Sequence, residues 1–212
     1  MNIKRFLLAI LISFVSISYI KAYNAISQQF IDAPFDLIPT ISRSTRMDML
    51  DYYESGLARP STSYFGDEIL ITELTDNSLS ATTSDHCQIK LYLSTLDTDT
   101  FTVAIETIQI PAEESRIYIY DKNWNLVTYK DSGVIKEWTN GVNDNNLFRK
   151  IENAVSFITA KADFNPDTNI LTLSSTLEQR GDCNNEEFKH IAPYLKPSRS
   201  FILNKKGFVE IK

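Results

Sequence analysis

The stretch from Cys87 to Tyr129 most constrains the fold, because apolar and polar residues alternate along it in several short runs. Alternation with a period of two, rich in β-branched and aromatic residues, is typical of antiparallel strands. The residues between the runs, at 97–100 and 121–123, include the Asp and Asn residues that turns prefer. The sequence therefore predicts an antiparallel β-meander with strands near residues 87–94, 101–106, 116–120 and 124–129.

Three tyrosines stand out within this meander. Tyr92, Tyr118 and Tyr120 are expected to share one face, opposite the aliphatic residues at positions 89, 91, 117 and 119. Tyrosine combines a large contact area with a hydrogen-bonding tip, which suits a recognition surface. The favoured interpretation is that other elements cover the three rings as a second layer of core. The alternative is an exposed patch that binds a partner.

The rest of the chain predicts an α+β fold, an antiparallel β-meander/hairpin sheet with a few helices packed on one face. Residues 23–41 are expected to form a lead-in that packs on the core. Ser42 or Ser44 can cap a helix over residues 42–55, and Gly56 suits the left-handed position just past its end. Further short helices are predicted over residues 147–157 and from about residue 185, where Pro193 should end the helix. Further hairpins are predicted over residues 68–83, 158–176 and 201–211.

The first 22 residues have the three parts of a secretory signal peptide. Lys4 and Arg5 precede an apolar run from Phe6 to Ile20, and a small residue, Ala22, ends the segment. The alternative is a membrane anchor, but the run is shorter than a typical spanning helix and no second apolar run follows. We therefore expect no transmembrane span after cleavage. Residues 23–212 are then expected to form a single exported domain. Sub-lobes at 23–130 and 147–212 are the alternative, because the residues between them are polar and turn-rich.

The formal net charge of −6 argues against a nucleic-acid partner, because binding to phosphates requires clustered Lys and Arg. The charged signal segment contains three basic residues and no acid, so its removal makes the remaining chain more acidic. The sequence also lacks the polybasic stretch that would hold the protein to anionic lipid. A protein or glycan partner in the cell envelope is the remaining expectation.

The segment from Pro34 to Gly56 carries a family resemblance. It reads Asp36-Leu37-Ile38-Pro39, then Arg46-Met47-Asp48-Met49-Leu50-Asp51-Tyr52-Tyr53 and Ser55-Gly56. A proline-containing lead-in before an Arg-x-Asp helix that ends near a glycine resembles the opening motif of an exported bacterial family, domain of unknown function 3256. Glu73-Leu74-Thr75-Asp76 resembles the family's next segment. The resemblance implies a periplasmic or cell-surface protein of a Gram-negative bacterium, and it assigns no activity, catalytic residue or cofactor.

Residues suited to catalysis are few. His86 and His190 are the only histidines, and neither lies in a nucleophile or metal-binding motif. The acidic pairs Glu113-Glu114 and Glu186-Glu187 are interpreted as solvated charges at a turn and at a helix start. We therefore expect no catalytic residues, no metal and no cofactor, in a non-catalytic binding or scaffolding module. The alternative is a secreted hydrolase that uses dispersed carboxylates.

Cys87 and Cys183 are the only cysteines, and both remain after signal cleavage. In an oxidising compartment a single pair can form a disulfide that closes a long loop. Two buried thiols are the equally favoured alternative. The sequence leaves this choice open.

Overall fold

The protein is built around a six-stranded antiparallel sheet with the strand order β3-β4-β5-β6-β7-β8. The computed structural model describes residues 23–57, 59–183 and 185–211, so the predicted signal peptide at residues 1–22 lies outside the described residues. The strands are Ile71–Leu74 (β3), Ser78–Ser84 (β4), Cys87–Leu96 (β5), Asp99–Ile108 (β6), Glu114–Asp121 (β7) and Leu126–Lys130 (β8). The predicted meander is confirmed as β5 to β8, and the hairpin predicted before it supplies β3 and β4.

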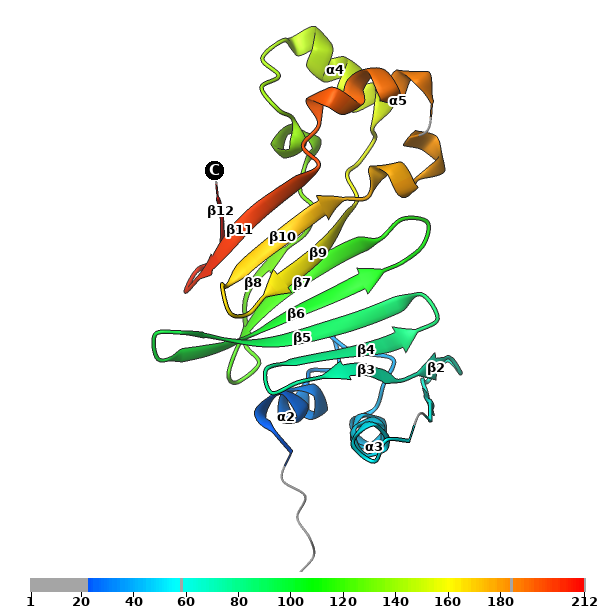
Figure 1. Cartoon of the computed structure of the whole chain (residues 1–212), viewed down its shortest axis with the longest axis vertical. Coiled ribbons are helices and arrows are strands. Elements are labelled where there is room, and N and C mark those ends of the chain that lie inside the picture. Colours follow the sequence, from blue (N-terminus) through cyan, green and yellow to red (C-terminus); the bar gives the residue numbers. More distant parts are fainter. Residues whose placement is uncertain (1–22, 58, 184, 212) are drawn as a thin grey trace, which may run out of the picture.

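A four-stranded antiparallel sheet covers one face of the six-stranded sheet (Figure 1). Its order is β12-β11-β10-β9, from strands Ala160–Asn165 (β9), Ile170–Ser175 (β10), Ser198–Asn204 (β11) and Gly207–Glu210 (β12). Strand β9 contacts β6 and β7, and β12 contacts β8. A single hydrophobic cluster lies between the sheets and includes Val103, Ile117, Leu171 and Phe201, so residues of both predicted sub-lobes share one core.

Helices α2 (Ala25–Asp32) and α3 (Arg43–Glu54) cover the opposite face of the six-stranded sheet, together with a hairpin of β1 (Ser61–Thr62) and β2 (Glu68–Ile69). The predicted caps of α3 are confirmed: the Ser42 side chain accepts a hydrogen bond from the Thr45 amide, and Gly56 has a φ of +68°. Helix α2 lies in the segment that was expected only to pack as a lead-in. Its apolar residues fall on one face, and Asn24 caps it.

The remaining helices lie at the other end of the molecule, above the four-stranded sheet in Figure 1. They are 3-10 turns at Ile135–Trp138 (η1), Leu177–Gln179 (η2), Gly181–Cys183 (η3) and Ala192–Tyr194 (η4), and α-helices at Asn145–Ala154 (α4) and Glu186–Ile191 (α5). Both predicted helices of this region are thus present, and α5 ends two residues before Pro193. Their buried side chains, among them Trp138 and Ile151, extend the cluster between the two sheets. The α+β fold is confirmed.

Strand register overturns the predicted arrangement of the tyrosines. Tyr92 lies opposite Val103 on β6, which lies opposite Ile119 on β7, so these three side chains share one face. Tyr118 lies opposite Ala104, which lies opposite Leu91, so these three share the other face. Tyr92 therefore faces the four-stranded sheet, and Tyr118 and Tyr120 face α2 and α3. The prediction that the three tyrosines share one face is wrong, because an apolar residue can lie on either side of a sheet that is covered on both.

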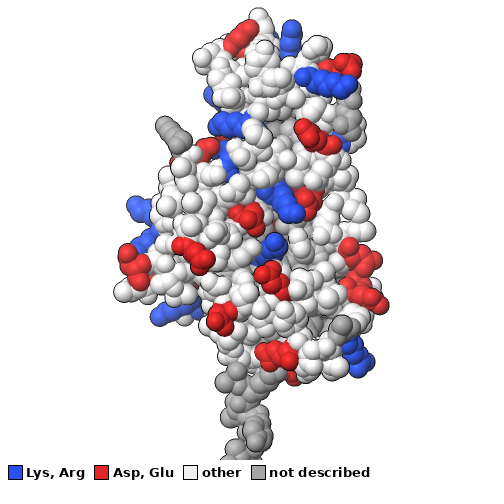
Figure 2. All heavy atoms as spheres, viewed as in Figure 1, with Lys and Arg blue, Asp and Glu red and all other residues white. Residues whose placement is uncertain are grey.

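The surface carries no dominant charge on the face drawn in Figure 2, where acidic and basic side chains are interspersed. Within the described ranges, no helix combines the length and apolar character needed to cross a membrane.

Candidate functional site

Burial limits the part that two of the predicted tyrosines can play in binding. Tyr92 is 9% exposed and Tyr120 is 8% exposed. Burial raises the pKa of the Tyr92 hydroxyl to about 12, with Asp163 and Glu73 adding to the shift. Burial also raises the pKa of Tyr120. The favoured interpretation of these two rings as core is consistent with their positions.

Tyr118 belongs to a row of aromatic rings on the helix-covered face. Its ring stacks on Tyr120 at 6.3 Å between centroids and contacts Tyr129 at 5.3 Å, while Trp124 meets Tyr120 edge-on at 5.0 Å. The row runs from the core near α2 to the exposed ring of Tyr129 on β8. Tyr118 is half-buried within this row, and its predicted binding role stays a prediction.

No disulfide joins the two cysteines, both of which the structure describes. Cys87 begins β5 in phase with Ile89 and Leu91, on the face toward α2 and α3. Cys183 lies in η3 and belongs to the cluster on the other side of the sheet. The six-stranded sheet thus separates the two side chains, and the possible disulfide of the sequence analysis is not formed.

One carboxylate of each acidic pair, Glu113 and Glu186, forms an ion pair. Glu113 accepts a hydrogen bond from Lys161 at 2.7 Å, and this bond holds the pKa of the Glu113 carboxyl below its usual value. Glu186 pairs with Lys189 at 2.6 Å across one turn of α5. Across the described residues, no three His, Cys, Asp or Glu side chains come together as a metal site. Glu113 and Glu186 therefore each have a basic partner.

A hollow of about 570 Å³ with both polar and apolar lining residues lies near α4 and η1. Three carboxylates, Glu114, Asp131 and Glu152, line it together with Lys136. The hydrolase hypothesis would place its acid and base here. The hollow also contains exposed apolar side chains, such as Val134 and Phe157.

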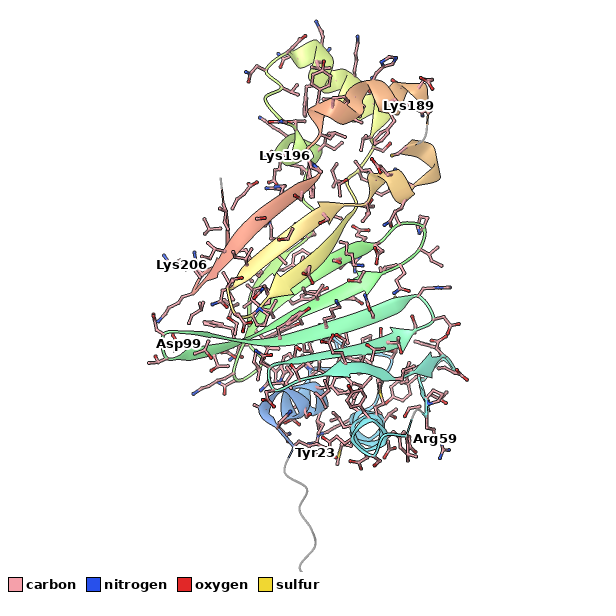
Figure 3. All side chains as sticks on the ribbon, in the orientation of Figure 1. Tyr23, Arg59, Asp99, Lys189, Lys196 and Lys206 are labelled. Atoms are coloured by element: carbon pink, nitrogen blue, oxygen red, sulfur yellow. The ribbon has the colours of Figure 1, made fainter. Side chains whose placement is uncertain are left out.

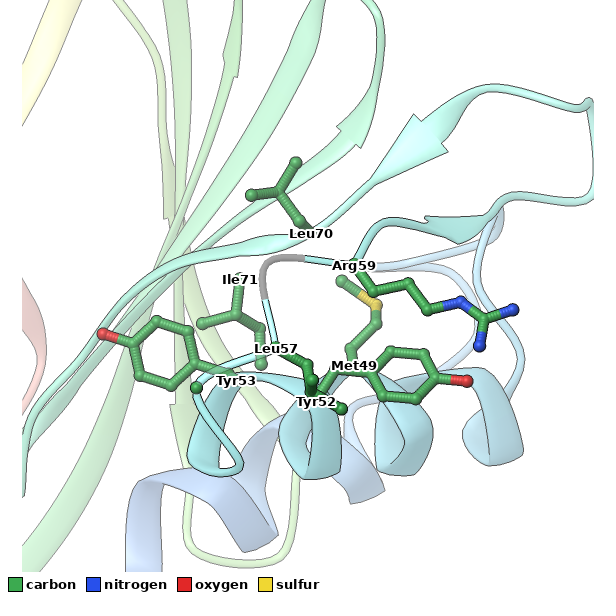
Figure 4. A pocket seen from close by; sticks show the side chains of 8 residues that line it. Met49, Tyr52, Tyr53, Leu57, Arg59, Leu70 and Ile71 are labelled. Carbon is green, nitrogen blue, oxygen red and sulfur yellow. The ribbon is translucent and has the colours of Figure 1, made fainter.

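The best-formed apolar site is a groove of about 240 Å³ between α3 and β3 (Figure 4). We call it the α3–β3 groove, and it is lined by Met49, Tyr52, Tyr53, Gly56, Leu57, Arg59, Leu70 and Ile71. Met49 and Ile71 are buried at its base, whereas Tyr53, Leu57 and Leu70 are exposed. Exposed apolar groups around a concave base are typical of a binding site.

The end of α3 shapes this groove. The Leu57 amide donates to the Tyr52 carbonyl at 2.9 Å, and the Gly56 amide donates to the Tyr53 carbonyl at 3.0 Å. This pair of bonds is a Schellman motif, which needs the left-handed backbone that Gly56 supplies. The Arg59 amide then donates to the Leu57 carbonyl. The chain therefore turns back over the last turn of the helix.

Arg59 gives the groove one charged end. Its guanidinium lies 5.4 Å from the centroid of the Tyr52 ring, within the range of a cation–π contact. In Figure 4 the Arg59 and Tyr52 side chains extend to the same side, and the Tyr53 ring lies at the opposite side of the groove. Arg59 forms no ion pair with any residue of the described ranges. Figure 3 shows it at the α3 end of the molecule, remote from Lys189.

Helix α3 is itself fixed to α2 by a buried arginine. The Arg46 side chain donates from Nη1 to the Phe30 carbonyl at 2.9 Å and to the Ala33 carbonyl at 2.7 Å. Both carbonyls belong to the end of α2, where a cation also interacts favourably with the helix dipole. Burial lowers the pKa of Arg46. Arg46 thus positions the helix that carries half of the groove.

Sequence reasoning did not identify the groove. Helical spacing puts Tyr53 on the same face as the buried Met49 and Leu50, but Tyr53 is 38% exposed. The available signal was the apolar residue Leu57 directly after the glycine that ends the helix, followed closely by a basic residue. Leu70 gave no signal, because its exposure depends on how far α3 covers β3.

Comparisons with known proteins agree with this fold. A family model described as "Protein of unknown function (DUF3256)" matches residues 19–208. A solved structure, described as a domain of an uncharacterized protein from Porphyromonas gingivalis W83, is similar with a TM-score of 0.71 and 16% sequence identity. The match covers 89% of this chain and 100% of that one. No curated protein matches the sequence.

Proposed function

The chain belongs to the DUF3256 family of proteins of unknown function, and from that premise we propose that it is a non-catalytic binding module of the cell envelope. The α3–β3 groove is its binding site. It binds a segment of a partner protein that presents an apolar or aromatic side chain beside a carboxylate. Arg59 carries this proposal, because it is a cation without an ion-pair partner, among the described residues, at the rim of an apolar groove.

The apolar lining of the groove and the charge of Arg59 favour a protein segment as ligand over a glycan. Its base and walls are apolar except for the tyrosine hydroxyls and Arg59, so it offers few hydrogen bonds to a sugar. An apolar side chain gains free energy when it leaves water for such a surface. A neighbouring carboxylate then gains a charge-assisted contact with Arg59.

A peptide-display selection against the mature protein tests the proposal. We expect the wild type to enrich peptides in which an aromatic or aliphatic residue lies close to Asp or Glu. Arg59→Glu should shift the preference to Lys or Arg, because it reverses the charge at the rim. Arg149→Glu, at an exposed position on α4, is the matched control and should leave the selection unchanged. Enrichment that ignores Arg59→Glu would rule the groove out as the binding site.

Export is the second part of the proposal, and it places the mature protein in the periplasm or on the surface of a Gram-negative bacterium. It is supported by Lys4, Arg5, the apolar run to Ile20 and the small residue Ala22. We expect N-terminal sequencing of the protein from its own host to begin at Tyr23 or within a few residues of it. Recovery of the chain with Met1 intact in the membrane fraction would contradict export by cleavage.

A further inference from the structure

The hairpin of β1 and β2 presents two of the most exposed aromatic rings in the described chain. Phe65 is 81% exposed and Tyr64 is 64% exposed, both in the turn that joins the two strands. Aromatic side chains are enriched where proteins meet. We call residues 61–69 the aromatic hairpin.

This hairpin is held in a fixed conformation. The Ser63 hydroxyl oxygen accepts from the amides of Phe65 and Asp67, at 3.2 and 3.1 Å, and the hydroxyl donates to the Asp67 carboxylate. The Tyr64 amide donates to the Thr40 carbonyl, which ties the turn to the segment between α2 and α3. A rigid, pre-organised aromatic residue loses little conformational entropy when it docks.

The hairpin also has the charge that the α3–β3 groove lacks. Asp67 and the exposed Glu68 follow the aromatic residues after one glycine, Gly66. The groove combines an apolar base with the cation Arg59, which has no ion-pair partner in the described ranges. The chain therefore contains both an aromatic residue close to a carboxylate, in the aromatic hairpin, and a groove that suits this combination.

We propose that the aromatic hairpin of one copy docks in the α3–β3 groove of a second copy, with Phe65 in the groove and Glu68 near Arg59. The inference rests on the proposed function of the groove and names its partner. Strand β1 contacts α3, so hairpin and groove lie at the same end of the molecule. Two copies related by a two-fold axis can exchange hairpins, which gives a closed dimer and not a filament.

Sedimentation velocity of the mature protein over a wide concentration range tests the dimer. We expect the wild type to associate, and Phe65→Ser or Arg59→Glu to raise the dimer dissociation constant by roughly tenfold or more. Val134→Ser removes a comparably exposed apolar side chain elsewhere and should leave the dissociation constant unchanged. A double variant, Arg59→Glu with Glu68→Arg, should recover association because it restores opposite charges.

Mixing the two single variants separates docking from misfolding. A Phe65→Ser copy keeps its groove and an Arg59→Glu copy keeps its hairpin, so the mixture should associate more strongly than either variant alone. A wild type that stays monomeric, or a dimer that Phe65→Ser leaves intact, overturns the inference. If groove-dependent peptide selection succeeds in that case, the proposed function stands with another protein as partner. If the selection fails too, both are wrong.

Discussion

Replacing Arg46 by Met should lower the free energy of unfolding by about 3 kcal/mol, because it leaves two buried carbonyls without a donor. Those carbonyls belong to Phe30 and Ala33, which are 0% and 4% exposed. Met keeps most of the volume of the side chain, so lost packing contributes little. For a chain of this size, the melting temperature should fall by roughly 6–12 °C. Urea denaturation and thermal melts measure the two quantities.

Arg43→Met on the same helix is the control. Arg43 pairs with Asp32 at 3.0 Å, but the two side chains are 60% and 42% exposed, so the loss should stay below about 1 kcal/mol. Removing Arg46 also removes the cost of burying a cation, and this gain opposes the loss. Equal stabilities of wild type and Arg46→Met would mean that the two terms cancel and that Arg46 does not hold α2 and α3 together.

The strands were predictable because alternation is a local property. Strands β5 and β7 show it clearly and β6 less so, and the turns between the strands contain the expected residues. Which side chains of β5 and β7 share a face was not predictable. It depends on the number of residues in the turns, and one residue more or less moves the side chains of a strand to the other face. Both faces of this sheet are covered, so apolar residues such as Leu91 and Ile119 give no indication of which cover they meet.

The candidate site was harder to predict for a different reason. The capping residues of α3 were recognisable, since Ser42 and Gly56 act on their own neighbours. The groove depends on the separation of α3 from β3, which is set by packing over the whole helix-covered face. Helical spacing puts Arg46 on the face of Met49 and Leu50, but nothing local to Arg180 or Arg199 indicates burial. Arg46, Arg180 and Arg199 are at most 6% exposed, although arginine side chains are mostly exposed in folded proteins.

Arg199→Met should be the second strongly destabilising change, with a loss of about 2–3 kcal/mol at pH 7. Arg199 donates from Nε and Nη2 to both oxygens of Glu210, at 3.0 and 2.8 Å, and from Nη1 to Glu137 at 2.6 Å. Its guanidinium also lies over the rings of Trp138 and Phe201. Arg199 thus connects β11, β12 and η1. This loss is smaller than the one expected for a fully buried ion pair. Glu210 and Glu137 are partly exposed and can be hydrated once the arginine is gone.

The pH dependence of this loss identifies its source. The hydrogen bonds from Arg199, with smaller effects of Lys196 and Lys130, hold the pKa of Glu210 below its usual value. A carboxyl whose pKa is lower in the folded state stabilises the protein fully above its unfolded pKa of about 4.3, and this stability is lost as the pH falls through the folded value. The difference in unfolding free energy between wild type and Arg199→Met should therefore narrow below about pH 4.

Lys161→Met provides the comparison. Lys161 and Glu113 pair at 2.7 Å with side chains 43% and 23% exposed, so this change should cost less than about 1 kcal/mol at pH 7. A loss for Arg199→Met that stays constant from pH 7 to pH 3 would contradict the ion-pair explanation. The arginine would then act through the contact of its guanidinium with the rings of Trp138 and Phe201, because that contact does not depend on the protonation of Glu210.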